Sequence, residues 1–375
     1  MAASRLAYFA GCAVVMAADL APLPRTGLSV QLSGDAHLGN FGAFAAPDRR
    51  LVFGVDDFDE TLPGPFEWDA MRLVASAEIA GRTRGLDADD RREAVRRTAR
   101  AFRASIRKLA GMKTLEVWYA RLEIEEITAR WGREAGTHQF ERPRTELDAF
   151  DRLTHDAGGE RRFRSEPPLV VPVAELDPAG GLEAQIREIV RSYTDGLADD
   201  RRAVLERFRY VDAARKVVGI GSVGLRTWML LMLGRDEEDA LFLQVKEAGP
   251  SVLEAHLGPS AFESHAQRVV VGQRLTQAAS DLLLGWTSSQ GRDYYVRQLW
   301  DGKARADPER MDAATLAVYG EVCAWALAHS HARSGDPVAL GSYLGHGDAF
   351  DEALEAFAER YADQNDADYA AFIRA

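Results

Sequence analysis

Two short acidic motifs lie close together near the beginning of the chain. The first covers residues 34–40 (GDAHLGN) and the second covers residues 55–60 (VDDFDE). Phosphoryl transfer uses an Asp beside the attacking hydroxyl, an Asn that helps to hold Mg²⁺, and a further Asp on the metal. In protein kinases the first Asp precedes the Asn by five positions, and Asp35 and Asn40 have this spacing. The further Asp lies in an Asp-Phe-x context, which Asp57 matches, so the two motifs together favour phosphoryl-transfer chemistry.

The polar side chains of these motifs have assignable roles. We expect Asp35 to be catalytic. We expect Asn40, Asp57 and Asp59 to be metal ligands, because Mg²⁺ is bound through oxygen atoms, above all those of carboxylates. His37, which we group with Asp35, could act as a base, a metal ligand or a structural hydrogen-bonding group. Either motif alone could instead be a solvated acidic turn.

A glycine cluster far along the chain is the second candidate binding element. It runs as Gly219-Ile-Gly221-Ser222-Val-Gly224 and is followed by Lys246. A dinucleotide-binding fingerprint would open a helix, but the next residues (LRTWMLLML) have the pattern of a strand, followed by an acidic turn and another strand. This order suits a glycine hairpin over nucleotide phosphates and a strand lysine that contacts them. A plain hairpin is the alternative, but Lys246 lies in an apolar run (FLQVKEA), which indicates a buried charge with a partner.

The elements that must position these motifs are helices at both ends of the chain and strands between them. Hydrophobic periodicity and turn residues indicate their order. The expected elements are two strands within 28–56 separated by a loop, a helix over 67–85, two helices within 88–135, an irregular stretch with a short strand over 136–182, helical pattern over 183–210, two strands on each side of a helix at 261–280, a helix over 309–332, and a helix over 348–374 with a break at 362–366 (ADQND). The fold class is therefore α+β with a small, mostly antiparallel sheet.

The order of the motifs is the reverse of that in a kinase, because the glycine loop follows the catalytic loop. A circular permutation would reconcile the two orders, since folds tolerate cutting and rejoining where the termini lie near each other. We predict four segments. Residues 1–135 form the catalytic-loop part of a helical lobe, and residues 136–205 form an irregular connection with a helix. Residues 206–305 form a small sheet lobe with the glycine loop and Lys246, and residues 306–375 form C-terminal helices that complete the helical lobe.

Eight segments together resemble a bacterial family catalogued as domain of unknown function 2252. They are GDAHLGNFG, DDFDET, PFEWD, RKVVGIGSVG, LQVKEA, VVVGQR, YYVRQL and HARSGD. This family is similar to the aminoglycoside-phosphotransferase branch of the protein-kinase-like fold, and the resemblance covers most of the chain. It implies a protein-kinase-like, two-lobed α+β fold that is circularly permuted, with the catalytic-loop lobe first and the glycine-loop sheet lobe second. It also implies ATP and Mg²⁺ as cofactors.

The catalytic loop of that branch has the form H-G-D-x-H-x-x-N. Asp35, His37 and Asn40 match this form, whereas Ser33 stands in place of the first His. The metal-binding Asp of the branch matches Asp57.

Two further segments carry the resemblance outside the catalytic loop. Residues 68–70 (WDA) resemble a D-L-A helix start, and residues 330–332 (SHA) resemble the L-H-A end of the helix before the catalytic loop. In a permuted chain that helix would lie near the C-terminus, as it does here. The family pattern also expects a helical Glu to pair with Lys246. Only Glu263 is available for this, with the uncharged Gln273 as another candidate.

The composition of the chain limits the classes of molecule that the protein is expected to bind. The chain has 375 residues, with 46 Lys and Arg against 58 Asp and Glu and a net charge of −12, which disfavours nucleic acid. Cys12 and Cys323 are too few for a disulfide framework or a structural zinc site. Residues 7–18 could be a short signal-peptide core, but a buried helix is favoured. We therefore expect a cytoplasmic protein that binds neither nucleic acid nor a membrane.

These features predict an ATP- and Mg²⁺-dependent phosphotransferase that acts on a hydroxyl of a small molecule or a protein. A pseudokinase, which would bind nucleotide or nothing and act as a partner-regulated scaffold, is one alternative. A nucleotidyl transferase on the same fold, which would attach AMP, is another. A metal-dependent hydrolase could use Asp35, His37, Asp57 and Asp59, but this reading leaves Lys246 and the glycines unexplained. No motif names the acceptor, because function depends on the site and not on the fold.

Overall fold

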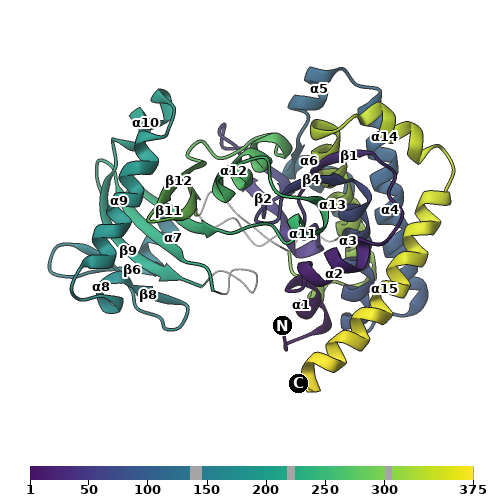
Figure 1. Ribbon diagram of the computed structural model, residues 1–375, viewed down its shortest axis with the longest axis horizontal. Coiled ribbons are helices and arrows are strands. Elements are labelled where there is room, and N and C mark those ends of the chain that lie inside the picture. Colours follow the sequence, from purple (N-terminus) through teal and green to yellow (C-terminus); the bar gives the residue numbers. More distant parts are fainter. Residues whose placement is uncertain (136–145, 218–223, 300–305, 375) are drawn as a thin grey trace.

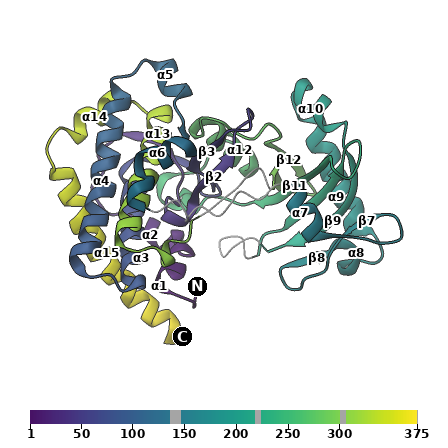
Figure 2. The same cartoon turned by 180° about the vertical axis from the view of Figure 1, so that it is seen from behind.

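The computed structural model describes residues 1–135, 146–217, 224–299 and 306–374. Figure 1 shows a strand-rich part beside a helical part, and Figure 2 shows the same arrangement from behind. The helical part is made from both ends of the chain, whereas the strand-rich part comes from its middle. The expected α+β class is confirmed. Within the described ranges, no helix is long and apolar enough to cross a membrane.

The helical part packs its helices around one apolar core. Its helices are α1 (Arg5–Ala10), α2 (Ala13–Leu20), α3 (Glu67–Arg84), α4 (Ala88–Ala110), α5 (Thr114–Tyr119), α6 (Ile124–Ala135), α13 (Ala313–Ser334), α14 (Pro337–Leu344) and α15 (Ala349–Arg374). The core draws buried side chains from both 6–127 and 248–362. α13 approaches α4 so closely that a Cβ on Gly320 would lie 2.1 Å from Oγ1 of Thr98. The two ends of the chain therefore fold as one unit.

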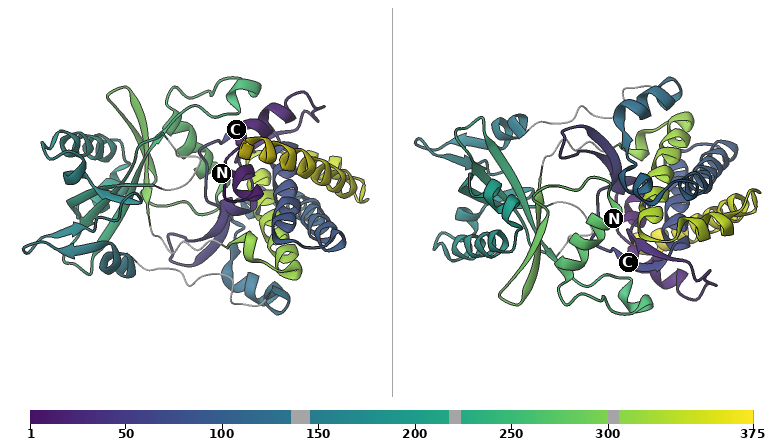
Figure 3. Two further views of the ribbon diagram at one scale, coloured as in Figure 1. Left: turned by 90° about the horizontal axis from the view of Figure 1, so that it is seen from below. Right: turned by 90° about the horizontal axis from the view of Figure 1, so that it is seen from above.

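Short strands and helices lie between the helical core and the large sheet. They are β1 (Ser29–Leu32) paired with β4 (Leu62–Pro65), the sheet β2 (Phe41–Ala45), β3 (Leu51–Val55) and β5 (Leu122–Glu123), the 3-10 helix η1 (Leu38–Asn40), α11 (Glu254–Leu257) and α12 (His265–Thr276). A second 3-10 helix, η3 (Pro308–Arg310), contacts α3 in the helical part. Figure 3 shows the purple β2–β3 segment between the strand-rich and helical parts. The candidate catalytic motifs flank this hairpin, so they lie where the two parts meet.

The strand-rich part is built on a six-stranded antiparallel sheet. Its strand order is β12–β13–β11–β10–β9–β8. The elements of this part are α7 (Glu146–Leu153), β6 (Thr154–Asp156), β7 (Arg161–Phe163), β8 (Val170–Pro172), α8 (Val173–Leu176), α9 (Gly181–Asp195), α10 (Asp199–Leu205), β9 (Arg209–Lys216), β10 (Thr227–Leu233), β11 (Ala240–Ala248), β12 (Gly285–Ser289) and β13 (Arg292–Gln298). The expected hairpin of β10 and β11, with an acidic tip, is present.

The continuous apolar run of β10 is explained by cover on both faces of the sheet. Leu230 and Met232 pack in a core with Ile189 of α9. The alternate residues Met229 and Leu231 pack in a second core with side chains of α7 and β7. Because successive side chains of a strand point to opposite faces, a strand covered on both sides has no polar alternation.

Some local expectations are wrong. The stretch 136–182, expected to be irregular with one short strand, contains α7, β6, β7 and α8 as well as β8 within its described residues. The 348–374 helix has no break at 362–366, because its polar residues bind neighbouring helices: Asn365 donates to Arg5 O at 3.4 Å, and Asp366 pairs with Arg5 at 2.8 Å and with Arg82 at 3.2 Å. The Gly/Asn/Phe-rich stretch predicted as a loop contains strand β2, whose small residues pair with β3. The polar residues at 362–366 therefore do not interrupt the helix, and the glycine and small residues of β2 do not prevent a strand.

Candidate functional site

The β2–β3 hairpin brings the two acidic motifs to one place. Phe41 pairs with Val55 at the end of this antiparallel ladder. Asn40 directly precedes β2 and Asp56 directly follows β3, and the Asp56 N–H donates to the Asn40 carbonyl at 3.1 Å. The first motif is therefore joined to the second by backbone pairing.

The carboxylate of Asp35 is held by two side chains. Arg72 of α3 donates through Nε to Oδ1 at 2.5 Å. Asn40 donates through Nδ2 to Oδ2 at 3.1 Å and to the Asp35 carbonyl at 2.9 Å. Nε2 of His37 lies 3.7 Å from Oδ2, which is beyond hydrogen-bond distance. Asp35, His37 and Asn40 are thus brought together.

The loop that carries Asp35 is anchored on Asp69, at the beginning of α3. Asp69 accepts hydrogen bonds from the backbone N–H groups of Ser33 at 2.8 Å and Gly34 at 3.1 Å. His331 near the end of α13 lies 3.1 Å from the same carboxylate. At Gly34 the φ angle is +84°, and a Cβ would lie 2.3 Å from the carbonyl oxygen of Glu60, so only glycine fits. Residues from both ends of the chain therefore shape this loop.

Lys246 on β11 reaches the second motif. Its ammonium group forms an ion pair with the Asp59 carboxylate, and its side chain is only 4% exposed. The Tyr295 hydroxyl donates to Oδ1 of Asp59 at 2.8 Å, from the position opposite Lys246 on β13. Burial opposes the charge on Lys246, but Tyr295, Asp59 and Asp57 outweigh burial and raise the pKa of the ammonium group. Lys246 is therefore a buried, paired cation.

The expected partner of Lys246 is corrected by this contact. Glu263 precedes α12 and is exposed, and Gln273 donates to Gln277 at 2.9 Å. The acidic partner comes from the loop after β3 instead of from the helix. Asp59, expected as a metal ligand, has its two carboxylate oxygens directed at Lys246 and Tyr295.

Asp57 lies in the same cluster of charges. The Asp59 N–H donates to Oδ1 of Asp57 at 3.2 Å. Arg297 of β13 is buried and donates to the Asp56 carbonyl at 2.9 Å. Asp57 is among the neighbours that support its charge. Arg297 also donates to Gln244 at 2.9 Å. The second motif is therefore fixed to the sheet through Lys246 and Arg297.

Glu60 is a further carboxylate near the site. Its Oε2 accepts from the Val252 N–H at 2.7 Å. Burial raises the pKa of Glu60 to about 7; the hydrogen bond from Val252 opposes this, and the nearby negative charges of Asp35 and Asp59 add to it. Glu60 therefore adds a group that titrates near neutral pH beside the candidate catalytic carboxylate.

The predicted glycine loop is described only in part. Gly219, Gly221 and Ser222 lie outside the described residues, and Gly224 has a φ of +92°. The strands on either side, β9 and β10, are antiparallel neighbours. Thr227, three positions after Gly224, pairs with Lys246 across β10 and β11. Gly224, the described end of the glycine segment, therefore lies three residues before the position that pairs with Lys246.

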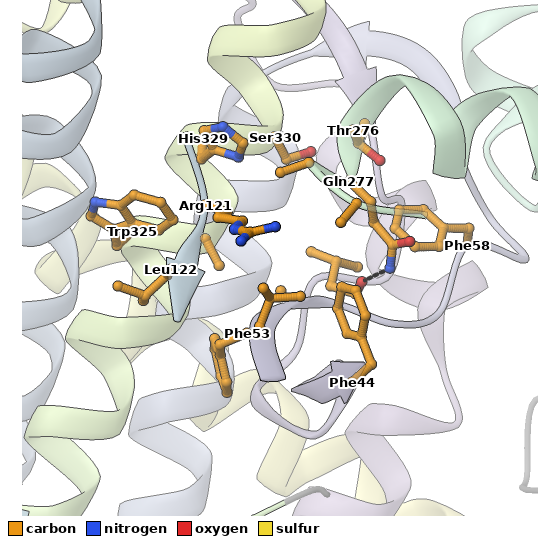
Figure 4. Close-up of a pocket in the computed structure, with 16 residues that line it drawn as sticks. Phe44, Phe53, Phe58, Arg121, Leu122, Thr276, Gln277, Trp325, His329 and Ser330 are labelled. Carbon is orange, nitrogen blue, oxygen red and sulfur yellow. Dashed lines mark hydrogen bonds between the residues drawn. The ribbon is translucent and has the colours of Figure 1, made fainter. Parts of the chain in front are cut away.

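A small cavity lies behind the second motif. It has a volume of about 30 Å³ and is lined by β2, β3, the end of α12 and α13. Figure 4 shows Phe58, Gln277, His329 and Ser330 around it, with Gln277 donating to the Val55 carbonyl at 2.6 Å. This volume suits one or two water molecules. It is too small for a nucleotide.

Three site residues were missed from the sequence. Arg72 contacts Asp35, Tyr295 contacts Asp59, and Glu60 lies near both carboxylates. Arg72 could have been found from its position three residues after Asp69, one turn along α3. The contact of Tyr295 had no local signal, since its partner is 236 positions away.

Comparison with known proteins places the chain in a family. No curated protein and no solved structure matches it. One family, described as "Uncharacterized protein conserved in bacteria (DUF2252)", matches residues 1–375. The match spans the strand-rich part, the helical part and both acidic motifs. The chain therefore belongs to the DUF2252 family of bacterial proteins.

Proposed function

We propose that this protein is an ATP- and Mg²⁺-dependent phosphotransferase with a circularly permuted, protein-kinase-like fold. The observation that carries the proposal is the ion pair of Lys246 with Asp59, which are 187 positions apart. It joins a sheet lysine to the acidic motif that also contains Asp57 and adjoins Asp35. A lysine for phosphates, an Asp for metal and an Asp for the acceptor are the groups that phosphoryl transfer needs in one place.

The proposed roles follow from the positions of the side chains. Lys246 contacts the ATP phosphates. Asp35 orients the acceptor hydroxyl and takes its proton as the acceptor oxygen bonds to the γ-phosphorus. The bond between that phosphorus and the bridging oxygen breaks, and ADP leaves with the electron pair.

The donor atoms near the hairpin fit a Mg²⁺ ion that is shared with a nucleotide. Asn40 uses its Nδ2 to bind Asp35, so its Oδ1 is the atom available to a metal, and Asp57 lies across the hairpin end. Within the described ranges, no group of three or more His, Cys, Asp and Glu side chains could hold a metal. Mg²⁺ often takes only one or two protein carboxylates and fills its other positions with substrate phosphates and water.

Two contacts between distant segments support the permuted fold. His331, near the end of α13, lies against Asp69 and thus next to the loop of Asp35. The ends of the chain also meet, since the Tyr369 hydroxyl donates to the Ala2 carbonyl at 3.0 Å. Figure 1 shows both termini at the same edge of the helical part. Adjacent termini are the condition under which a chain can be permuted without changing its fold.

The contacts of Asp59 weaken the hydrolase alternative. That reading needs the Asp59 carboxylate as a metal ligand, but the carboxylate is bound by Lys246 and Tyr295. It also gives no role to a lysine that is buried at the site.

Incubation of the protein with Mg²⁺ and ATP labelled on either the α or the γ phosphate tests the proposal. Transfer of the γ label to an acceptor or to water supports a phosphotransferase. Transfer of the α label would instead show nucleotidyl transfer, and ATP binding without turnover would show a pseudokinase. Absence of ATP binding would contradict both the phosphotransferase and the nucleotidyl transferase. Asp57→Asn is the matched variant and should abolish the Mg²⁺-dependent binding.

A further inference from the structure

We infer that Arg72 is the positioning residue for the catalytic carboxylate, and that it ties Asp35 to the N-terminal helices α1 and α2. This inference rests on the proposed function, because it assigns Asp35 a task that requires a fixed orientation. Arg72 acts through Asp35 and is not expected to touch substrate. Arg72 belongs to none of the sequence motifs, so its contact with Asp35 was not predicted from the sequence.

The guanidinium of Arg72 is held on several sides. Its Nε and Nη2 atoms face the same Asp35 oxygen at 2.5 Å. Nη2 also donates to the Phe9 carbonyl at 3.1 Å, and Nη1 lies 3.5 Å from the sulfur of Met16. The group stacks over the Phe9 ring at 4.3 Å. The side chain is only 4% exposed, so its position is determined by these partners.

These partners come from three different elements. Arg72 lies on α3, Phe9 on α1 and Met16 on α2. Asp35 lies in the loop after β1. Because α3 also supplies Asp69, which binds the Ser33 and Gly34 N–H groups, one helix holds both the backbone and the carboxylate of this loop.

The two carboxylate oxygens of Asp35 face different groups. Oδ1 is bound by Arg72, whereas Oδ2 is directed toward Asn40 and His37. Oδ2 therefore lies on the side of the proposed metal and acceptor. Without Arg72 the carboxylate could rotate, and both oxygens would sample other positions. A lysine could keep the charge, but it lacks the planar fork that binds Asp35 and Phe9 together.

Steady-state ATP turnover with Mg²⁺ tests the inference, with water or a hydroxyl compound as acceptor. In Arg72→Ala we expect kcat to fall by about 100-fold, the loss that a misplaced catalytic group causes. The KM for ATP should change by less than about threefold, because the interaction acts on the reacting groups rather than on nucleotide binding. Arg72→Lys should lose about tenfold in kcat, since the charge remains but the fork is lost.

Chemical rescue distinguishes positioning from a structural role. Guanidinium chloride at low millimolar concentration should restore part of the kcat of Arg72→Ala, and equal sodium chloride should not. Asp35→Ala should show no rescue. Arg82→Ala is the matched control, because Arg82 lies on the same helix and pairs with Glu78 and Asp363 away from the site. Its kcat should equal that of the wild type.

Each outcome supports or overturns the inference about Arg72. Loss of kcat with rescue and with an unchanged KM supports the inference. Normal kcat in folded Arg72 variants overturns it and leaves the proposed function standing. A kcat that falls only in proportion to the folded fraction of the variant, without rescue, also overturns the inference. If Arg72→Ala does not fold, the kcat and the folded fraction of Arg72→Lys are compared instead. If the wild type neither binds nor turns over ATP, the proposed function fails and the inference fails with it.

Discussion

At the scale of single residues, the site depends on two buried cations, each paired with a partly exposed carboxylate. Arg72 pairs with Asp35, Lys246 pairs with Asp59, and Tyr295 completes the second pair. A buried charge is costly unless it is paired and hydrogen-bonded, so removal of one partner affects the other. The first two predictions concern the hydroxyl of Tyr295 and His329, a buried histidine that lines the small cavity.

Removal of the Tyr295 hydroxyl should weaken nucleotide binding without unfolding the sheet. Tyr295→Phe deletes one hydrogen bond to the Asp59 carboxylate and leaves the ring in place. Hydrogen bonds to charged groups contribute about 1.5–3 kcal/mol, so we expect a loss of about tenfold or more in affinity for Mg²⁺-ATP, measured by calorimetry. Tyr294→Phe is the control, since Tyr294 is the adjacent residue and packs in the core on the opposite face. Equal affinities in the two variants would contradict the role of Tyr295.

His329 should make the protein less stable as the pH falls. Burial lowers the pKa of His329 to about 4; the hydrogen bond to the Val117 carbonyl opposes this, and Arg333 adds to it. An unfolded His has a pKa of about 6.5, so between about pH 6.5 and pH 4 the unfolded state binds the additional proton and the free energy of unfolding decreases. The decrease from this group should reach about 3 kcal/mol and stop below that range.

Urea unfolding at several pH values measures this effect. His329→Gln keeps a donor for the Val117 carbonyl but does not titrate. Its free energy of unfolding should therefore decline less than that of the wild type between pH 6.5 and pH 4. The same slope in both proteins would show that His329 is not the responsible group.

At the scale of elements, ion pairs join α4 and α3 to the C-terminal helix α15. Arg103 of α4 binds Asp351 through two hydrogen bonds of 2.9 and 2.6 Å, and both side chains are almost completely buried. Arg82 of α3 binds Asp363 at 2.6 Å. Arg92 and Arg96 of α4 also pair with Glu355 of α15. Basic residues of α4 therefore face acidic residues of α15, which lies along the outer edge of the helical part (Figure 1).

Breaking the buried pair between α4 and α15 should strongly destabilise the protein. Arg103→Ala leaves the Asp351 carboxylate buried without its partner, which costs about 3–5 kcal/mol. Arg191→Ala removes an exposed partner of Glu188 on α9 and should cost less than about 1 kcal/mol. Thermal and urea unfolding measure both changes. A cost for Arg103→Ala as small as that for Arg191→Ala would contradict the buried pairing.

At the scale of the whole molecule, the candidate site lies where the strand-rich and helical parts meet. Lys246 and Tyr295 belong to the large sheet, whereas Asp35 and Asp69 belong to segments packed on the helical core. A nucleotide bound between Lys246 and Asp57 would contact both parts. Its binding free energy would then stabilise the folded state of the molecule as a whole.

Mg²⁺-ATP should raise the unfolding temperature of the wild-type protein. A ligand at about 100 times its Kd adds about 2.7 kcal/mol to the free energy of unfolding. The shift should be absent in Lys246→Met, which removes the proposed phosphate contact, and it should disappear when Mg²⁺ is chelated. An equal shift in Lys246→Met, measured by differential scanning fluorimetry, would place the nucleotide elsewhere on the molecule.

Local sequence signals predicted the elements that depend on neighbouring residues. The helix expected at 67–85 begins at Glu67 and ends before Gly85, whose φ of +79° is a left-handed cap that glycine adopts easily. The apolar runs around the acidic turn predicted β10 and β11. The five-residue spacing of Asp35 and Asn40 put both in one predicted motif, and their side chains are in contact at 3.1 Å. Such features act over a few residues, so the sequence alone determines them.

Contacts between distant segments were decided only by the tertiary structure. The partner of Lys246 is Asp59 and not Glu263, because the loop after β3, and not the beginning of α12, packs against β11 at this position. The polar residues at 362–366 continue a helix because α1 and α3 supply partners for them. Each of these outcomes depends on which surfaces pack together after the chain has folded, and no periodicity or spacing within one segment encodes that choice.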